Sequence, residues 1–593
     1  MTGLGGLARY DPRWPGAERA LARMVQLERD HAGARDSADS QGGFSAIAVN
    51  GARQGSSPLA EEDGMAVWLD GEVYATEATC GGFEPGPRTA AVCVLRAFLR
   101  RDGRAAALAA LDGRYVAVVH DCRAGCVHLV TDRLGDRFLF WTVVGGALAW
   151  STTLGGLLAV PSFVPRVDEQ AVREFVQVGH MLGQRTWFAG VQLVPPGSVV
   201  SFDLTDGSVT TERYWWWDHI ARVEDPPPLV EAADEAARLF TESVEARCVG
   251  ATRLGVYLSG GLDSRAVAAA AAPRHLTAAL SFGVRDCLDV QIAARVCRRL
   301  HVPHFIYELT PANWLAPRIP AIWRTGGMVN ITHLHGVEAL ESAAGLFDTY
   351  LEGYGGDNFV RGDSLQSRNV LDRFDRRFVL AYTGCPAEWL DDLDEYESLG
   401  RSEYVHLENR VRRLWSAAAQ TDEALLHPRR PFSANRMIEF VYSLPDRMRY
   451  RGRLYRAMLL RTYPDLYDDI PWAATGVPIS WVRGSGRVYR YWRAVEKRLT
   501  GKSSAVGLDR RGPKDYADYP AWFRVDPARS FYERLVLSPD SLATQYVARD
   551  AVRRDWDEVQ AGRGSAELVA RYLTMEIWLR QVYGGWLPAD FDA

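Results

Sequence analysis

The stretch Tyr257-Leu258-Ser259-Gly260-Gly261-Leu262-Asp263-Ser264 decides how the chain is interpreted. It follows an apolar, strand-like segment, 254–258, and precedes the alanine-rich, helix-like segment 265–272. Glycines let backbone N–H groups approach a ligand closely, and the N-terminus of the following helix favours an anion. Since Asp263 repels an anion, a cation that bridges this carboxylate to phosphate is implied. The pattern predicts a phosphate-binding loop, with a plain strand–turn–helix connection as the alternative.

The sequence on both sides of this loop predicts two domains. After the loop, the strand-like segment 276–283 alternates with helix-like segments, which favours a doubly wound parallel sheet. Before the loop, short β-rich segments with Gly and Asp turns, such as 64–75, are typical of sheets with a buried face. A proline triplet at 226–228 is the best linker candidate. We therefore expect one domain over residues 1–220 and a second over 229–593.

A second motif, Leu351-Glu352-Gly353-Tyr354-Gly355-Gly356-Asp357, follows another strand-like stretch. Its aspartate lies 94 residues after Asp263 (357 minus 263). Alone, a glycine-rich turn with one aspartate is a weak signal, because tight turns have the same composition. After the first motif, it indicates the opposite wall of a nucleotide site, with Asp357 as a second contact for Mg²⁺.

Composition excludes several classes of protein. With 593 residues, 47% hydrophobic and 24% charged, the chain is of ordinary globular composition, so wholesale disorder is excluded. A formal net charge of −5 excludes a basic nucleic-acid coat. The eight cysteines form no CxxC pair, which favours free thiols in the cytoplasm over a disulfide framework or a zinc site. No signal core and no run of about 18 apolar residues occurs, so no integral membrane segment is expected.

The two motifs resemble those of the asparagine-synthetase-like enzymes, which form amides with ATP. The first is similar to the loop of ATP pyrophosphatases (the PP-loop), which release AMP and pyrophosphate. LDGEVYA (69–75) and TDRLGDRFLF (131–140) look like the family's glutaminase-type domain, and RPFSANRMIEFVYSLPDRMRYRG (430–452) and IPWAATG (470–476) look like its synthetase domain. The resemblance implies an N-terminal Ntn-hydrolase-like α/β/β/α sandwich. It also implies a C-terminal PP-loop domain, a doubly wound parallel sheet with helical additions, that binds ATP and Mg²⁺.

The same resemblance assigns the nucleotide site residue by residue. Asp263 and Asp357 would hold Mg²⁺. The nucleotide would be bound by residues of the two motifs and of the segment 276–283, namely Leu258, Ser259, Gly260, Gly261, Asp263, Ser264, Ser281, Gly283, Glu352, Gly353, Gly355 and Gly356.

Three further positions are catalytic candidates by resemblance. Tyr354 occupies the place of a catalytic Tyr in β-lactam synthetases, although it could instead simply pack. Since the ordinary pKa of Tyr is about 10, it acts as a base only if cations lower that value or a carboxylate relays the proton. Glu388 lies 31 residues after the end of the second motif (388 minus 357), about where those enzymes place a partner Glu, but it also fits a surface helix. Arg456 falls where the family has a charge-stabilising Lys, with Arg453 and Lys502 as rivals.

The glutaminase-like half departs from the family pattern at two positions. Working glutaminases of the family carry a Cys directly after the initiator Met, where this chain has Thr2. An N-terminal Thr can be a nucleophile on some folds. Asp70, however, takes the place of the Asn that binds the oxyanion, and a carboxylate there would repel it. We therefore expect a degenerate domain that releases no ammonia from glutamine.

An amide-forming enzyme without a glutaminase needs another amine. The lasso peptide macrolactam synthetases and the β-lactam-type synthetases let an amine of the same substrate attack an acyl-adenylate, and ammonia-dependent amide formation is a third option. Because the Arg-, Tyr- and Trp-rich tail from about 477 to 593 exceeds what a small β-lactam precursor requires, the lasso peptide cyclase is favoured. That resemblance implies a core peptide closed between its N-terminal amine and an Asp or Glu side chain. It also implies a leader peptidase, a leader-recognition protein and a large, water-excluding cavity.

A local excess of basic residues leaves two interpretations open. From 447 to 514 the chain has sixteen Lys and Arg against five acidic residues, with Trp and Tyr between them. This segment would be either a solvated face or a wall of the active site. Basic residues with aromatic residues between them are also typical of RNA-binding segments. RNA-modifying PP-loop enzymes are therefore a distant alternative. Since such enzymes lack the N-terminal sandwich and the second motif, no nucleic-acid partner is expected. The two nucleotide-site aspartates argue against a binding protein without catalysis.

Overall fold

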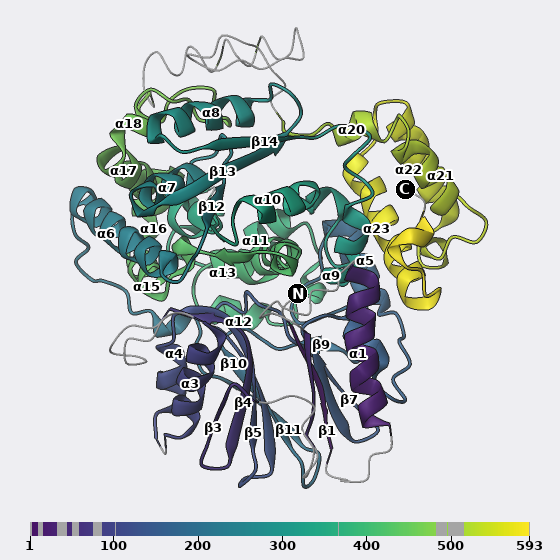
Figure 1. Ribbon diagram of the computed structural model, residues 1–593. Helices are drawn as coiled ribbons and strands as arrows, with labels where there is room; N and C mark the ends of the chain where they lie inside the picture. Colours follow the sequence, from purple (N-terminus) through teal and green to yellow (C-terminus); the bar gives the residue numbers. More distant parts are fainter. Residues whose placement is uncertain are drawn as a thin grey trace.

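The first part of the chain forms two sheets that pack face to face (Figure 1). The computed structural model describes residues 3–9, 16–32, 44–49, 58–74, 86–100, 102–365, 367–481, 491, 495 and 515–591. One sheet has the order β2-β1-β8-β7-β9, and the other has the order β11-β10-β6-β5-β4-β3. The strands are β1 (Gly3–Ala8), β2 (Phe44–Val49), β3 (Ala60–Glu62), β4 (Met65–Val73), β5 (Gly113–Asp121), β6 (Cys126–Thr131), β7 (Phe140–Val144), β8 (Ala147–Ser151), β9 (Gln192–Leu193), β10 (Ser198–Asp203) and β11 (Val209–Arg213). The helices are α1 (Ala17–Ala32), α3 (Pro87–Phe98), α4 (Arg104–Ala109) and α5 (Glu169–Val178).

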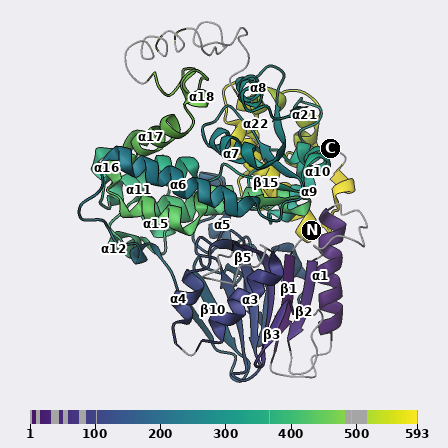
Figure 2. The ribbon, with the colours of Figure 1, turned by 60° about the vertical axis from the view of Figure 1, so that its left-hand side comes forward.

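Strand β5 illustrates how these layers are held together. Val116 and Val118 lie between the two sheets, in a cluster with Trp150 of β8. Tyr115 and Val119 face the other way and belong to the cluster that α3 joins. Successive side chains of a strand point to opposite faces, so one apolar run can serve both layers. Helix α3 covers one outer face and α1 covers the other, which confirms the expected α/β/β/α sandwich (Figures 1 and 2).

The second part of the chain is built on a five-stranded parallel sheet with the order β14-β13-β12-β15-β16. Its strands are β12 (Leu254–Tyr257), β13 (Leu276–Gly283), β14 (His304–Glu308), β15 (Thr349–Leu351) and β16 (His427–Arg429). Helices α7 (Asp263–Ala271) and α8 (Leu288–Leu300) pack on one face, and α10 (Leu340–Leu346) packs on the other. The alternation of strands and helices therefore forms the expected doubly wound parallel sheet.

The strand order reverses at the centre of this sheet, and this positions the site. Strands β13 and β14 extend the sheet on one side of β12, whereas β15 and β16 extend it on the other. In a doubly wound sheet, ligands bind in the crevice outside the carboxyl ends of the strands where the order reverses. The loop 258–262 leaves β12 here, and the motif 352–357 leaves β15. Both motifs therefore start from the same edge of the sheet.

The two domains share one continuous apolar core. Helix α6 (Leu229–Cys248) begins directly after the proline triplet and packs in the same cluster as the β4–β5 sheet. Trp217, from the end of the first domain, stacks on Tyr404 of the second with 4.8 Å between ring centroids. The ring of Tyr442 lies 5.0 Å from the same indole. This part of the interface between the domains is thus aromatic and buried.

The described part of the tail, 515–591, forms a helical unit at the edge of the molecule (yellow in Figure 1). It contains α20 (Tyr519–Trp522), α21 (Ala528–Leu535), α22 (Arg549–Gln560) and α23 (Ala566–Tyr583). Trp556 is buried, and Trp578 packs against Trp323 of α9 (Arg318–Arg324) at 5.5 Å between ring centroids. Much of the aromatic content that indicated a peptide-binding tail is therefore core. Most of the segment 482–514, Lys502 included, lies outside the described residues.

The cysteines depart from expectation at one position. Six are free thiols, as expected: Cys122, Cys126, Cys248, Cys287, Cys297 and Cys385. Cys93, however, is disulfide-bonded, which corrects the expectation that all are free. Within the described residues, we find no helix that combines the length and the apolar character needed to span a bilayer.

Candidate functional site

The loop between β12 and α7 has the features of an anion site. The Gly261 N–H donates to Ser259 Oγ at 3.1 Å, and the Ser259 N–H donates to Ser264 Oγ at 3.2 Å. The Gly260 N–H donates to Asp289 Oδ1 at 2.8 Å. The residue that precedes α7 is apolar and offers no side-chain cap. An uncapped helix N-terminus beside two hydroxyls and a glycine turn is suited to a phosphate group.

The second motif packs directly on this loop. A Cβ at position 353 would lie 2.7 Å from the backbone N of Ser264, and a Cβ at position 356 would lie 2.7 Å from Asp263 Cγ. Real Cβ atoms do not approach other atoms so closely, so Gly353 and Gly356 are both required for the contact. The structure therefore brings together the two motifs that the sequence places 94 residues apart.

The two aspartates of the site act on each other electrostatically. Burial and the charge of Asp357 raise the pKa of Asp263 to about 7, and burial raises the pKa of Asp357 as well. Tyr455 donates its OH to Asp263 Oδ1 at 2.6 Å, and Arg361 Nη2 lies 3.9 Å from Asp357 Oδ2. Two neighbouring, partly buried carboxylates that repel each other favour a cation between them. Mg²⁺ is commonly held by one or two carboxylates together with substrate phosphates, so this pair fits the ion.

Arg265 connects the loop to the segment 470–476, a role that the sequence did not reveal. Its guanidinium donates to the carbonyl oxygens of Pro471 at 2.9 Å and of Ile470 at 3.2 Å. The Ala473 N–H in turn donates to the Gly260 carbonyl oxygen at 3.1 Å. The family resemblance pointed to 470–476 but not to this function. We conclude that the segment shapes the phosphate loop from outside.

Three other residues that were expected to bind the nucleotide make contacts within the framework of the parallel sheet. Ser281 Oγ donates to the Leu258 carbonyl oxygen at 2.6 Å and lies 2.8 Å from His304 Nε2. Gly283 ends β13, and a Cβ there would lie 3.2 Å from Cβ of Tyr516. Ser281 and Leu258 are both buried. Their contact with nucleotide stays a prediction, whereas their contribution to the site's framework is seen directly.

Tyr354 lies in a buried network that crosses the domain interface. Its OH lies 2.8 Å from Ser416 Oγ and 3.3 Å from Asp136 Oδ1, and the Arg430 guanidinium lies 3.9 Å from its ring centroid. Arg430 also pairs with Asp136 at 3.2 Å. Burial and Asp136 raise the pKa of Tyr354 well above its ordinary value. This direction opposes the role of a base, which stays a prediction, and favours a hydrogen-bonding role.

The other two catalytic candidates occupy different surroundings. Glu388 is exposed in the short turn Ala387–Trp389, and it has no hydrogen bond or ion pair among the described residues. The structure places it as the surface alternative expected. Arg456 lies on α17 (Arg453–Thr462), directly after Tyr455, which contacts Asp263. The charge-stabilising role of Arg456 stays a prediction, and its rival Arg453 is exposed.

A cavity of ≈ 210 Å³ lies beside the second motif. Its polar lining is His333, His335, Glu352, Tyr354, Arg410 and Asp422, and its apolar wall includes Leu414 and Trp415. Glu352 is paired with Arg430, whose Nε donates to Oε2 at 2.9 Å. Burial raises the pKa of Asp422 to about 7. The cavity therefore adjoins the nucleotide motif and combines charged and apolar walls.

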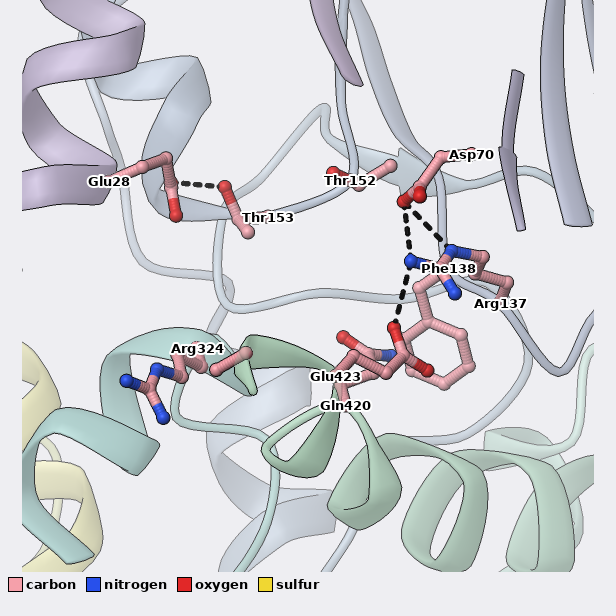
Figure 3. A pocket seen from close by; sticks show the side chains of 10 residues that line it. Glu28, Asp70, Arg137, Phe138, Thr152, Thr153, Arg324, Gln420 and Glu423 are labelled. Atoms are coloured by element: carbon pink, nitrogen blue, oxygen red, sulfur yellow. Dashed lines mark hydrogen bonds and ion pairs between the residues drawn. The ribbon is translucent and has the colours of Figure 1, made fainter. Parts of the chain in front are cut away.

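A second cavity of only ≈ 30 Å³ lies between the domains (Figure 3). Asp70 accepts a hydrogen bond from Arg137 Nε at 2.8 Å, and Arg137 Nη2 lies 3.1 Å from Glu423 Oε2. Arg114 also pairs with Glu423. Although burial alone would raise it, Arg114 and Arg137 hold the pKa of Glu423 below its ordinary value. The carboxylate at position 70 is thus closed by an ion-pair network that ties the two domains. Thr2 lies outside the described residues.

The two cavities lie on opposite sides of one short segment, 417–424. Gln420 and Glu423 line the small cavity, whereas Ala419 and Asp422 line the large one. Neighbouring acids of one turn therefore point into different cavities. The partners of Glu423 come from the first domain, so sequence spacing gave no signal for them.

Two family models match the chain. Residues 235–466 match the model described as asparagine synthase, and residues 1–215 match the model described as glutamine amidotransferase domain. Asparagine synthetase [glutamine-hydrolyzing] 2 of Bacillus subtilis is 25% identical over 282 residues, which are 44% of this chain and 37% of that protein. Amidase chyE of Penicillium rubens is 29% identical over 166 residues, 27% of this chain and 23% of that protein.

A solved structure of glutamine phosphoribosylpyrophosphate amidotransferase from B. subtilis, complexed with ADP and GMP, is also similar. It has 12% identity and a TM-score of 0.18 over 52% of this chain and 58% of that one. The matched regions span well under two thirds of the curated relatives. The fold is thus a glutamine-amidotransferase-type (Ntn) domain followed by an asparagine synthase domain. These matches support the asparagine-synthetase-like family of ATP-dependent amide ligases.

Proposed function

We propose that the protein is an ATP-dependent carbon–nitrogen ligase that activates a carboxylate as an acyl-adenylate. The observation that carries this proposal is the contact of the two motifs at the strand-order reversal, where Gly353 and Gly356 pack on Ser264 and Asp263. This arrangement supports a triphosphate lying over the N-terminus of α7. Asp263 and Asp357 would hold Mg²⁺, which would neutralise charge on the phosphates.

The reaction has two steps, which balance as follows. A substrate carboxylate oxygen attacks the α-phosphorus of ATP, the bond to the β-phosphate oxygen breaks, and pyrophosphate leaves. An amine then attacks the acyl carbonyl, loses one proton and displaces AMP. The loop N–H groups and hydroxyls would orient the phosphates, and Arg456 would offset negative charge. Tyr354 or a group in the adjoining cavity would hold the hydrogen bond through which the amine's proton departs.

The amine is proposed to come from the substrate rather than from glutamine. The ion-pair network of Asp70, Arg137 and Glu423 supports this, because it engages the residue that stands where the family resemblance has the oxyanion-binding Asn. Within this class we propose a lasso peptide macrolactam synthetase. It would join a core peptide's N-terminal amine to an Asp or Glu side chain, together with a leader peptidase and a leader-recognition protein.

One observation favours a second candidate. The cavity beside the nucleotide motif measures ≈ 210 Å³, below the roughly 300–1,000 Å³ typical of sites for drug-sized ligands. It therefore suits a single side chain or a small amino acid more than a folded ring. A β-lactam-type or ammonia-dependent amide ligase acting on a small molecule is the alternative. Both candidates use the same adenylation chemistry and differ in the amine.

The test is ATP–pyrophosphate exchange with labelled pyrophosphate. The protein is incubated with Mg²⁺, ATP and, in separate reactions, L-aspartate, L-glutamate and peptides with a free N-terminal amine and one Asp side chain. Exchange only with the peptides supports the macrolactam synthetase, and exchange with free amino acids alone supports the second candidate. Release of ADP, or no exchange with any carboxylate, overturns the proposal. Glutamine added as the amine donor should change nothing.

A further inference from the structure

Arg410 differs from the neighbouring arginines in its hydrogen bonding. It lies in the π-helix Leu407–Ser416, as do Arg412 and Arg413. Arg412 donates to the carbonyl oxygens of Gly135 and Val194, and Arg413 donates to that of Met181. Arg410 has no hydrogen bond or ion pair among the residues the structure describes, although it is partly buried and lines the 210 Å³ cavity. Two of these arginines are structural, and the third has its guanidinium available.

The negative charges of the cavity are already compensated. Glu352 is paired with Arg430 at 2.9 Å. Asp422 accepts a hydrogen bond from Tyr350 OH at 2.5 Å, and its raised pKa of about 7 leaves it partly protonated near neutral pH. Neither acid therefore competes strongly for a cation on the opposite wall. The Glu567 carboxylate acts electrostatically on Arg410, but no hydrogen bond or ion pair holds the Arg410 guanidinium within the described part of the chain.

The two histidines of the cavity do not add a second cation. Burial lowers the pKa of His335 well below its ordinary value, and its ring nitrogen contacts Tyr516 OH. Burial also lowers the pKa of His333, against the opposing charge of Glu567 of α23 at 4.0 Å. Both imidazoles are therefore neutral at neutral pH. They can offer or accept hydrogen bonds but leave anion binding to Arg410.

We propose that Arg410 binds the substrate carboxylate that is to be activated, and so selects an Asp- or Glu-type side chain over its amide. A guanidinium presents a planar fork of donors that matches a carboxylate. It also offsets the repulsion between that carboxylate and a triphosphate at the adjoining motif. The inference deepens the proposed function and rests on it for the identity of the reaction, but not for carboxylate binding itself.

The first experiment measures binding without chemistry. Calorimetric titration of the full chain, without ATP, uses a peptide with a free N-terminal amine and one Asp, and the matching Asn peptide. The wild type should prefer the Asp peptide, and Arg410→Gln should lose that preference. Charge-assisted hydrogen bonds contribute about 1.5–3 kcal/mol, which corresponds to roughly a 10- to 150-fold weaker binding of the Asp peptide. Arg410→Lys should recover part of it.

The second experiment separates KM from turnover in pyrophosphate exchange. Arg410→Gln should raise the KM for the carboxyl substrate by a similar factor and leave the KM for ATP unchanged. Arg377→Gln, on the exposed side of α11 (Arg376–Thr383), is the matched control and should behave as wild type. Thermal unfolding should show that Arg410→Gln folds normally, since it breaks no hydrogen bond or ion pair among the described residues.

The outcomes distinguish the inference from the proposed function. If the wild type prefers the Asp peptide and Arg410→Gln does not, the inference stands, even if no exchange occurs and the proposed ligase activity fails. If the wild type binds Asp and Asn peptides equally, or Arg410→Gln keeps the preference, the inference is overturned. Exchange with an unchanged KM in Arg410→Gln overturns it as well.

Discussion

The two cavities on either side of the segment 417–424 differ in how their charges are satisfied. In the small one, Asp70, Arg137 and Glu423 form a closed chain of ion pairs. In the large one and the adjoining nucleotide loop, Asp263 repels Asp357, and Arg410 has no partner among the described residues. Buried charges that satisfy one another stabilise a structure, whereas charges held without compensation are prepared for a ligand. Two sets of charges that are satisfied differently thus lie on either side of one short segment.

The largest effect is expected at the pair of aspartates beside the large cavity, where Asp357 and Asp263 repel each other. Asp357→Asn should reduce ATP–pyrophosphate exchange by more than about 1,000-fold, because it removes a proposed Mg²⁺ ligand. It should not destabilise the fold, since it also removes the charge that raises the pKa of Asp263. Exchange rates and thermal unfolding measure both. Asp394→Asn, at an exposed position, is the control, and exchange at the wild-type rate in Asp357→Asn would contradict the comparison.

The next largest effect is expected at the small cavity, where the buried charges are paired. Arg137→Ala should lower the free energy of unfolding by about 3–5 kcal/mol, because it leaves two buried carboxylates without their shared partner. Urea denaturation followed by fluorescence measures the loss. Arg173→Ala removes an exposed ion pair with Glu169 and should cost far less. Equal losses in the two variants would mean that the closed network does not stabilise the protein.

Tyr354→Phe tests a residue that lines the large cavity and also contacts Asp136 of the first domain. If the hydroxyl assists the amine's proton, pyrophosphate exchange should stay within about twofold of wild type while amide formation slows about 100-fold. Quenched single-turnover assays separate the two steps. An equal loss in both steps would refute the role of a base. Ser416→Ala, which removes a hydrogen-bond partner of the same hydroxyl, tests whether orientation alone accounts for the effect.

The smallest effect is a pH dependence at the edge of the small cavity. Burial raises the pKa of Glu28 from 4.5 to about 7. Between these values the folded protein binds more protons than the unfolded chain, so wild-type stability falls as pH rises from about 4.5 to 7. Glu28→Gln should remove that fall, which is on the order of 3 kcal/mol of unfolding free energy between pH 4.5 and pH 8. Unfolding free energies at the two pH values measure it, and a parallel pH profile in the variant would contradict the assignment.

The sequence predicted the fold because its local signals agreed with one another. The loop 258–264, the strands around it and the second motif 351–357 each carry glycines and apolar runs that act over short distances. Their joint position followed from the rule for parallel sheets rather than from any contact. The sandwich was predicted from resemblance and alternation. These features depend on neighbours in sequence, which is why they could be recognised.

The parts that escaped prediction depend on partners distant in sequence. Tyr354 was a candidate base that could instead simply pack, and nothing in the sequence indicated its contacts with Asp136 of the other domain and with Arg430. The spacing that pointed to Glu388 could not distinguish a buried partner from an exposed turn. Arg410 lies within a run of arginines, and only the structure separates it from its bonded neighbours. Burial and pairing are tertiary properties, which spacing does not encode.

The aromatic contact of Trp217 with Tyr404 and Tyr442 bears on whether the second domain is soluble without the first. The last residues of the first domain cover apolar rings of the second, so loss of the first domain would expose those rings to water. We infer that expression of the ligase half alone yields an insoluble protein, whereas the two halves produced together in one cell restore a soluble pair.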